Sequence, residues 1–212
     1  MTRSRADDYD DKKQSILQQA AALFALNGFD GTSMRAVALA CGSSKSHLYH
    51  YFPHKEDLLF GVVSGYISSL AAELQEASEL PLPAEERFGR FIDAFVQHAV
   101  TSRHEQLVLT HELKYLPEPQ RATIRELQVR LVTLMVGLLK QINPGLMAPE
   151  QVRGPYAMLM FGMLIWMLTW YQQSGPIAPA ELAQRISQLL MGGFKSAQFP
   201  PPAGPAGARP SR

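Results

Sequence analysis

The segment from Tyr156 to Tyr171, YAMLMFGMLIWMLTWY, carries no charge over 16 residues, and it constrains the fold more than any other feature of the chain. A helix that crosses a bilayer needs about 20 apolar residues, whereas this run is short and is followed by the polar QQSG. A helix that is apolar on every side is buried on nearly every side. We therefore predict a helix that is buried against a partner surface of protein and does not span a membrane.

The rest of the chain also predicts helices, because no run shows the period-two alternation and β-branched side chains of a strand. Gly28 ends the first helix, since glycine accepts the left-handed backbone of a helix C-terminus. Pro53 ends a short helix, since proline has no N–H. The expected fold is all-α, with about nine helices and the shortest ones near the front. They cover about 10–27, 33–41, 44–51, 54–77, 88–99, 104–116, 122–142, 155–171 and 180–194.

Charge and cysteine content exclude some classes of protein. The formal net charge is +1 over 212 residues, so the chain as a whole has no basic field that would indicate nucleic acid. Cys41 is the single cysteine, so no disulfide can form within the chain. The N-terminal MTRSRADDYDDKKQ lacks the apolar core of a secretory signal. These features fit a cytoplasmic protein.

Residues 32–52, TSMRAVALACGSSKSHLYHYF, predict two short helices that meet at a turn containing Gly42. This is the layout of a helix-turn-helix, in which the second helix lies in the major groove of DNA. Local charge agrees with that reading. Arg35, Lys45 and Lys55 lie between residues 31 and 55, and that window contains no acidic residue. Phosphates would meet three positive charges there.

The front of the chain resembles the DNA-binding domain of the TetR/AcrR family of transcriptional regulators. The resemblance covers about the first quarter of the chain, and Cys41, Ser43 and Ser46 depart from the usual Ala, Val and Gly. The matching residues are Phe24, Gly28, Thr32, Ser33, Val37, Ala38, Gly42, Leu48, Tyr49, Phe52, Lys55 and Leu58.

The resemblance implies an operator-binding helix. Short side chains at Ser44, Ser46 and His47 would let that helix approach base edges, while Tyr49 and His50 would reach phosphates. Lys55 would meet a phosphate at the N-terminus of the next helix. The expected DNA contacts are Thr32, Ser33, Arg35, Ser44, Lys45, Ser46, His47, Tyr49, His50 and Lys55.

The same resemblance implies three regions. We expect a helix-turn-helix domain at 10–55 with its motif at about 33–52, a ligand-binding and dimerising domain at 56–197, and a disordered tail at 198–212 that is rich in proline, glycine and alanine. The expected function is that of a repressor, which a small molecule releases from a palindromic double-stranded DNA operator. Residues 107–128 and 169–186 resemble family members that sense acyl-CoA thioesters in their general character, without a defined motif.

Methionines and aromatics on the later helices suit an adaptable apolar cavity. It would open toward a polar spot near His98, His111 or Glu112 and accept an elongated apolar or aromatic molecule. The expected cavity residues are Phe91, Phe95, His98, His111, Glu112, Tyr115, Met135, Met158, Phe161, Met163 and Trp166.

The last two helices predict a homodimer with a four-helix, two-fold interface. One is apolar all round, and the other carries an apolar stripe that ends in a glycine pair. The expected interface residues are Leu164, Leu168, Tyr171, Leu182, Ile186, Leu189, Leu190 and Gly193.

Other functions have less support. His47, His50 and His54 are separated by Pro53, so they share no regular helix face, and a structural zinc site needs four converging ligands. No Gly-rich phosphate loop or G-x-S-x-G motif is present, so we expect no enzyme, catalytic residue, metal or cofactor. The alternative is a helical adaptor protein without a DNA role, which would leave the residue order from 32 to 55 unexplained.

Overall fold

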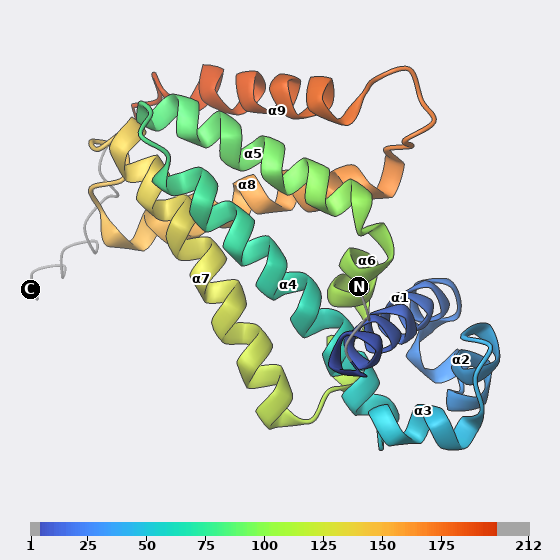
Figure 1. Ribbon diagram of the computed structural model, residues 1–212. Helices are drawn as coiled ribbons and strands as arrows, with labels where there is room; N and C mark the ends of the chain where they lie inside the picture. Colours follow the sequence, from blue (N-terminus) through green and yellow to red (C-terminus); the bar gives the residue numbers. More distant parts are fainter. Residues whose placement is uncertain (1–4, 199–212) are drawn as a thin grey trace, which may run out of the picture.

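The computed structural model describes residues 5–198, which form nine α-helices, one short 3₁₀ helix and no strand, so the all-α prediction is confirmed (Figure 1). The tail predicted for 198–212 lies outside the described residues, apart from Gln198. The elements are α1 (Arg5–Gly31), α2 (Met34–Ala40), α3 (Lys45–Tyr51), α4 (Lys55–Glu79), α5 (Ala84–Thr101), α6 (Arg103–His111), η1 (Leu113–Tyr115), α7 (Glu118–Ile142), α8 (Glu150–Trp170) and α9 (Pro179–Phe194).

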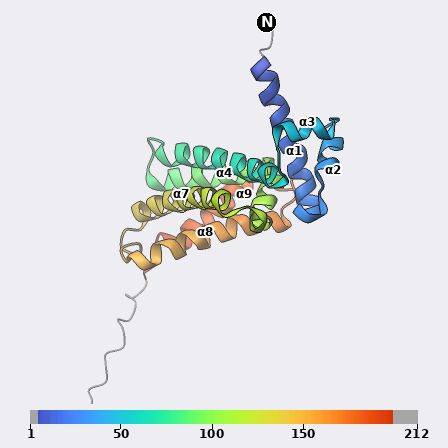
Figure 2. The same ribbon diagram turned by 90° about the horizontal axis from the view of Figure 1, so that it is seen from below.

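Helices α1 to α3 form a small unit at one end of the molecule (Figure 2). The hydroxyl oxygens of Ser33 and Ser44 cap α2 and α3 by accepting bonds from backbone N–H groups. Gly42 lies between the two helices with a φ of 59°, which a side chain would disfavour. Leu48 and Phe52 are buried, so one side of α3 is held in the core and the other faces outward.

Helix α1 differs from the prediction at both ends. It begins at Arg5 instead of near residue 10, and it continues to Gly31 through a break at Gly28, where φ is 72° and ψ is 169°. The predicted stop is therefore a kink, and residues after Gly28 form a turn that leads into α2. This turn is also where the body of the protein contacts the front unit.

The body is built around α4 and α5. Helix α4 leaves the front unit and runs beside α7, while α5 packs against both α4 and α9 (Figure 1). Phe88, Phe91 and Phe95 follow one face of α5 and are almost fully buried. The rings of Phe91 and Phe95 lie 6.3 and 5.9 Å from the ring of Phe161 on α8, so one aromatic cluster joins two layers of helices.

Helix α8 buries one side and exposes the other. Leu164, Leu168 and Tyr171 are buried within the protein, so they are not available to a partner chain and the predicted interface is corrected at these positions. A helix that is apolar all round gives no periodic signal for its inward side. The exposed large side chains of α8 are Met158, Leu159, Met163, Trp166 and Trp170.

Helix α9 requires the same kind of correction. Its apolar stripe of Leu182, Ile186 and Leu190 is buried in this chain, where α9 packs against α5. The helical period correctly identifies a stripe, but it does not say which surface covers it. Leu189, with 69% of its surface exposed, and Gly193 are the predicted interface residues that remain accessible.

Two helices of the described chain, α4 and α8, are long and apolar enough to cross a membrane by length and composition alone. In their most apolar windows, half of the α4 residues and a third of the α8 residues are buried inside the protein. Core helices pass the same test, so it does not separate a membrane span from a packed helix.

Candidate DNA-binding surface and effector cavity

The outer face of α3 carries most of the predicted DNA contacts. Ser44, Lys45, Ser46, His47, Tyr49 and His50 are all exposed, and Ser33 and Arg35 are exposed on or beside α2. The ammonium group of Lys45 lies 5.5 Å from the centre of the Tyr49 ring. The structure thus brings polar donors, acceptors and positive charge to the exposed surface of α2 and α3.

His47 is held in place by its neighbours. Its Nδ1 lies 2.8 Å from the hydroxyl oxygen of Ser43, and its ring meets the edge of Tyr51 at 5.2 Å. Tyr51 in turn stacks on Tyr9 of α1 at 4.6 Å. The serine at 43, which sequence reasoning identified only as an unusual residue, therefore helps to orient His47 on the outer face of α3.

Two predicted DNA contacts have roles inside the protein. The hydroxyl of Thr32 is buried, and it lies 2.9 Å from the carbonyl oxygen of Gly28. The ammonium group of Lys55 donates to the carbonyl oxygens of Phe29 and Thr32 at 2.6 and 2.9 Å. It also lies 4.0 Å from the centre of the Phe29 ring. Lys55 therefore satisfies the turn that follows Gly28, while its side chain stays partly exposed, and its role as a phosphate contact remains a prediction.

Three residues predicted to line the cavity lie elsewhere. Glu112 accepts a hydrogen bond from the backbone N–H of Phe29 at 3.2 Å. Tyr115 donates to the Asp30 carboxylate at 2.5 Å and stacks on Phe29 at 4.6 Å. The hydrogen bond to Asp30 raises the pKa of Tyr115 above its ordinary value. These residues join the body to the front unit, and His111 is exposed nearby.

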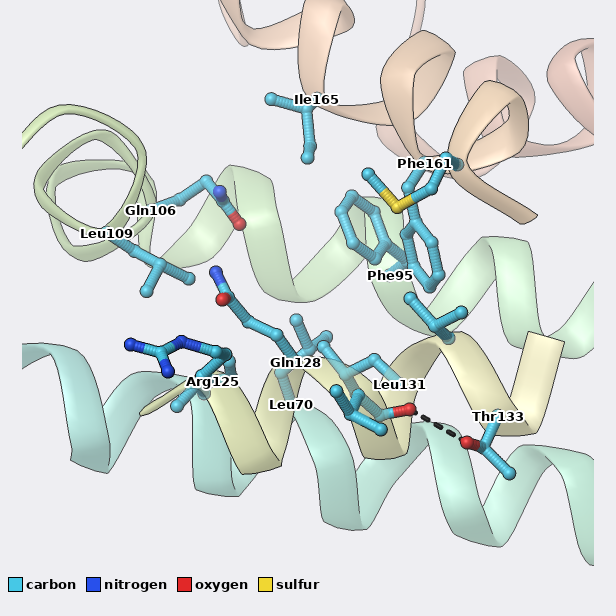
Figure 3. A pocket seen from close by; sticks show the side chains of 14 residues that line it. Leu70, Phe95, Gln106, Leu109, Arg125, Gln128, Leu131, Thr133, Phe161 and Ile165 are labelled. Atoms are coloured by element: carbon cyan, nitrogen blue, oxygen red, sulfur yellow. Dashed lines mark hydrogen bonds between the residues drawn. The ribbon is translucent and has the colours of Figure 1, made fainter. Parts of the chain in front are cut away.

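A cavity of about 390 Å³ lies between α4, α5, α6, α7 and α8 (Figure 3). Gln106, Arg125 and Gln128 lie toward one end in this view, and Phe95 and Phe161 lie toward the other. Arg125 and Gln128 are exposed at the mouth, whereas Gln106 is buried. The cavity is lined by Ile67, Leu70, Phe95, Gln106, Leu109, Arg125, Gln128, Val129, Leu131, Val132, Thr133, Met158, Phe161 and Ile165.

Phe95, Met158 and Phe161 line this cavity, as the sequence predicted. The other apolar predictions do not. Phe91 and Met135 are buried away from its walls, and Met163 and Trp166 are exposed on the outer side of α8. A pattern of apolar residues does not separate core, cavity and outer surface, because all three use the same side chains.

The polar end of the cavity was missed by sequence reasoning. Arg125 and Gln128 lie on α7 among other polar residues, so the sequence reads them as a solvated helix face. Gln106 gave a usable signal, because it lies three residues before Leu109 on the buried side of α6. A lone amide on an apolar helix face indicates either a satisfied core group or a group that faces a ligand.

A second cavity, of about 200 Å³, lies between α1 and the body, and His98 lines it. The Nδ1 atom of His98 lies 2.9 Å from the Glu73 carboxylate, while its buried Nε2 has no hydrogen-bond partner among the residues that the structure describes. The ring of Tyr66 lies 4.8 Å from the His98 ring. The predicted polar spot near His98 therefore belongs to a space separate from the apolar cavity.

Within residues 5–198, no group of three or more His, Cys, Asp or Glu side chains is placed to hold a metal ion. His47 and His50 both contact the ring of Tyr51, and the backbone N–H of His54 donates to the Asp57 carboxylate at 3.2 Å at the start of α4. Each histidine in this stretch therefore has a structural environment of its own.

Two family models match the chain in its two parts. The model described as bacterial regulatory proteins, tetR family, matches residues 16–62. The model described as tetracyclin repressor-like, C-terminal domain, matches residues 81–194, which is more than half of the chain. The first match contains the exposed face of α3, and the second contains most of the walls of the 390 Å³ cavity.

The chain is similar to known proteins along almost its whole length. The transcriptional repressor KstR2 of Mycobacterium tuberculosis is 25% identical over 195 residues, covering 89% of this chain and 96% of its own. A TetR-family regulator from Bordetella parapertussis is 32% identical, with a TM-score of 0.82, and the match covers 89% of this chain and 98% of that one.

Other solved structures share the fold. PfmR from Thermus thermophilus is 27% identical with a TM-score of 0.75, over 84% of this chain and 97% of its own. AibR, in complex with isovaleryl coenzyme A and operator DNA, has a TM-score of 0.75 at 24% identity, over 87% of this chain and 98% of its own. The chain therefore belongs to the TetR family of transcriptional regulators, with an N-terminal helix-turn-helix DNA-binding domain.

Proposed function

We propose that this protein is a homodimeric repressor that binds a near-palindromic operator through α3 and leaves it when an acyl-CoA thioester occupies the 390 Å³ cavity. The observation that carries the proposal is the separation of apolar and polar side chains at opposite ends of that cavity. It has an apolar end at Phe95 and Phe161 and a polar end, with a cation, at Arg125. An adaptor protein without a DNA role would need neither this cavity nor the exposed face of α3.

The cavity suits an elongated ligand with an apolar tail. Its volume lies within the range of about 300–1,000 Å³ that is common for small-molecule sites, and most of its lining is apolar. Met158 at the wall is unbranched, so it can adapt to the shape of an acyl chain. An acyl group would occupy the end near Phe95 and Phe161, whose side chains are buried and pack against each other.

The mouth suits an anionic head. Arg125 lies at the exposed edge of the cavity, where its guanidinium bonds the Glu118 carboxylate at 2.9 Å. A phosphate group could compete for this arginine, because guanidinium groups bind phosphate with two parallel hydrogen bonds. The phosphates of coenzyme A would then stay outside while the thioester enters. The complex of AibR with isovaleryl coenzyme A supports this class of effector.

A dimer would cover the exposed side of α8. Trp166 and Trp170 have 67% and 55% of their surface exposed, and Leu189 of α9 is exposed as well. A soluble monomer seldom leaves such a group of large apolar side chains in water. In a two-fold dimer the two α3 helices would reach half-sites about 34–36 Å apart, or a multiple of that distance.

The experiment begins with selection of a binding sequence from randomised double-stranded DNA. The complex is then titrated with acyl-CoA thioesters of increasing chain length, with the matching free fatty acids and with aromatic acids, and fluorescence anisotropy follows DNA release. We expect release by an acyl-CoA at concentrations where free coenzyme A has no effect. Release by fatty acids alone would mean that the effector belongs to another chemical class. The absence of sequence-specific DNA binding would contradict the proposal that the protein recognises an operator.

A pair of variants tests the site itself. Phe161→Ala enlarges the apolar end, so it should change which chain length releases DNA best. Phe88→Ala serves as the matched control, because it removes an equally buried aromatic ring that does not line the cavity. Identical chain-length preferences in Phe161→Ala and the wild type would contradict binding in this cavity.

A further inference from the structure

Gln106 is a buried amide in a mostly apolar wall, with only 3% of its surface exposed. Its Oε1 accepts a hydrogen bond from the Tyr66 hydroxyl at 2.5 Å, and its Nε2 donates to the hydroxyl oxygen of Thr110 at 3.1 Å. An amide nitrogen carries two hydrogens. The structure records no second partner for Nε2 among residues 5–198, so one N–H remains for a molecule in the cavity.

Tyr66 connects this wall to the other side of α4. Its side chain is buried and lines the second cavity, which α1 closes with Gln14, Leu17 and Gln18. Burial raises the pKa of Tyr66, and the charges of Glu105 and Glu73 add to the increase. The hydroxyl therefore stays protonated in neutral solution, so it remains a hydrogen-bond donor to Gln106.

Helix α4 approaches the front unit closely at Gly61, which has no side chain of its own. A Cβ atom added at Gly61 would lie 2.8 Å from Leu17 of α1 and 3.2 Å from the ring of Phe52, which ends α3. One turn further along, a Cβ added at Gly65 would meet nothing within 4 Å. The helix is thus tightly packed at Gly61 and has free space beside Tyr66.

We propose that Gln106 recognises the carbonyl oxygen of the effector, and that its hydrogen bond to Tyr66 transmits binding to the contact between α4 and the DNA-binding unit. The inference rests on the proposed function. The carbonyl oxygen takes the second N–H of Gln106 and draws the amide into the cavity. The Tyr66 hydroxyl then loses its acceptor, and its ring turns into the second cavity. Helix α4 shifts against Leu17 and Phe52 as a result.

Only a ligand that favours one arrangement over the other can act in this way. The carbonyl oxygen supplies the difference, because its hydrogen bond from Nε2 pulls the amide toward the cavity and so moves Oε1 away from the Tyr66 hydroxyl, whose hydrogen bond it accepts in the empty protein. An apolar chain without that oxygen would fill the cavity and leave the hydrogen bond between Tyr66 and Gln106 in place. Gln106 therefore sets specificity, and Tyr66 acts as a positioning residue that the effector does not touch.

Two probes that differ in one atom test the recognition. Octanoyl-CoA has the carbonyl oxygen and S-octyl-CoA lacks it; if another chain length releases DNA better, the matched pair of that length is used. Calorimetry should show the wild type binding the thioester about 5- to 100-fold more tightly, the range expected for one unpaired buried polar group. Gln106→Met should bind both probes alike. Discrimination that survives in Gln106→Met would overturn the role of Gln106.

Tyr66→Phe tests the transmission. It should bind octanoyl-CoA within about threefold of the wild type, yet the effect of that ligand on operator affinity should fall toward one from the usual coupling of about 5- to 150-fold. Tyr171→Phe is the control, because Tyr171 is equally buried and donates to the carbonyl oxygen of Ile177 at 2.9 Å, while lining neither cavity. It should behave as the wild type.

The outcomes separate the inference from the function on which it rests. Operator binding without ligand shows that each variant is folded. Full coupling in Tyr66→Phe would overturn the transmission step while leaving the effector class intact. A wild type that responds to neither probe, at any chain length, would overturn the effector class and the role of Gln106 together.

Discussion

The carboxylate of Glu112 accepts a hydrogen bond from the backbone N–H of Phe29 at 3.2 Å, which joins the end of α6 to the turn before α2. The same nine-residue helix carries Gln106 and Leu109 in the wall of the effector cavity. Movement of α6 by a ligand would therefore reach the DNA-binding unit through a contact only a few residues away. Helix α6 would thus provide a second route from the cavity to the DNA-binding unit, in addition to the proposed route through Tyr66 and α4.

Glu112→Ala should lower the free energy of unfolding by about 1–3 kcal/mol, because it leaves a partly buried N–H without its charged acceptor. Urea unfolding followed by circular dichroism measures this change. The control is Glu181→Ala, which removes a surface ion pair with Arg185 on α9 and should cost no more than about 0.5 kcal/mol. Equal effects in the two variants would mean that the bond to Phe29 does not hold the domains together.

The two lysines at the front of the chain should respond differently to substitution. Lys55→Ala removes two hydrogen bonds to turn carbonyls and should destabilise the protein by about 2 kcal/mol. Lys45→Ala removes an exposed charge, so it should leave stability unchanged and reduce the salt dependence of DNA binding by about one unit of slope. Unfolding curves and anisotropy at several salt concentrations test the pair. A stable Lys55→Ala protein would contradict the assigned role.

The contact between Tyr115 and Asp30 should weaken in alkali. The hydrogen bond to Asp30 raises the pKa of Tyr115 above its ordinary value of 10.0. A raised pKa means that the contribution to stability is complete below about pH 10 and is lost as pH rises through the folded-state pKa. The difference in unfolding free energy between the wild type and Tyr115→Phe should shrink over this interval. A difference that stays constant from pH 8 to 11 would count against the bond.

Substitutions on the two sides of α8 should have different effects. Those on the outer side should affect dimer assembly, and those on the inner side should affect the stability of the fold. Trp166→Arg places a charge on the exposed side and should convert the dimer to a folded monomer. Leu168→Ala lies on the buried side and should cost about 2–5 kcal/mol of stability without preventing association. Light scattering after size-exclusion chromatography measures the first effect and thermal unfolding the second. A wild type that is monomeric at micromolar concentration would contradict the proposed interface.

The DNA-binding unit could be predicted from the sequence because its signals are local. Ser44 caps α3, Gly42 makes the turn and Leu48 points inward, and each role follows from residues close in the chain. The internal hydrogen bonds of Thr32 and Lys55 could not be predicted in this way. Their partners are the carbonyl oxygens of a turn whose position depends on the break at Gly28.

The body could be predicted only as a set of apolar helices. The inward side of α8 is decided by how α5 and α7 pack against it, and its sequence carries no charged residue after Arg153 to mark the outer side. The cavity likewise depends on polar residues of α7 that read as a solvated face. Gln106 was the one position where an amide on a buried helix side could have indicated the site.

In the proposed function, occupancy of the cavity is coupled to binding of the operator by α3. Coupling of this kind is reciprocal, so the factor by which an acyl-CoA weakens operator binding must equal the factor by which operator weakens acyl-CoA binding. Calorimetry with octanoyl-CoA, on the free protein and on its complex with the selected DNA, measures this most directly. We predict weaker binding to the complex by at least about fivefold, matched by the shift in operator affinity. Equal affinity for the two forms would contradict the account.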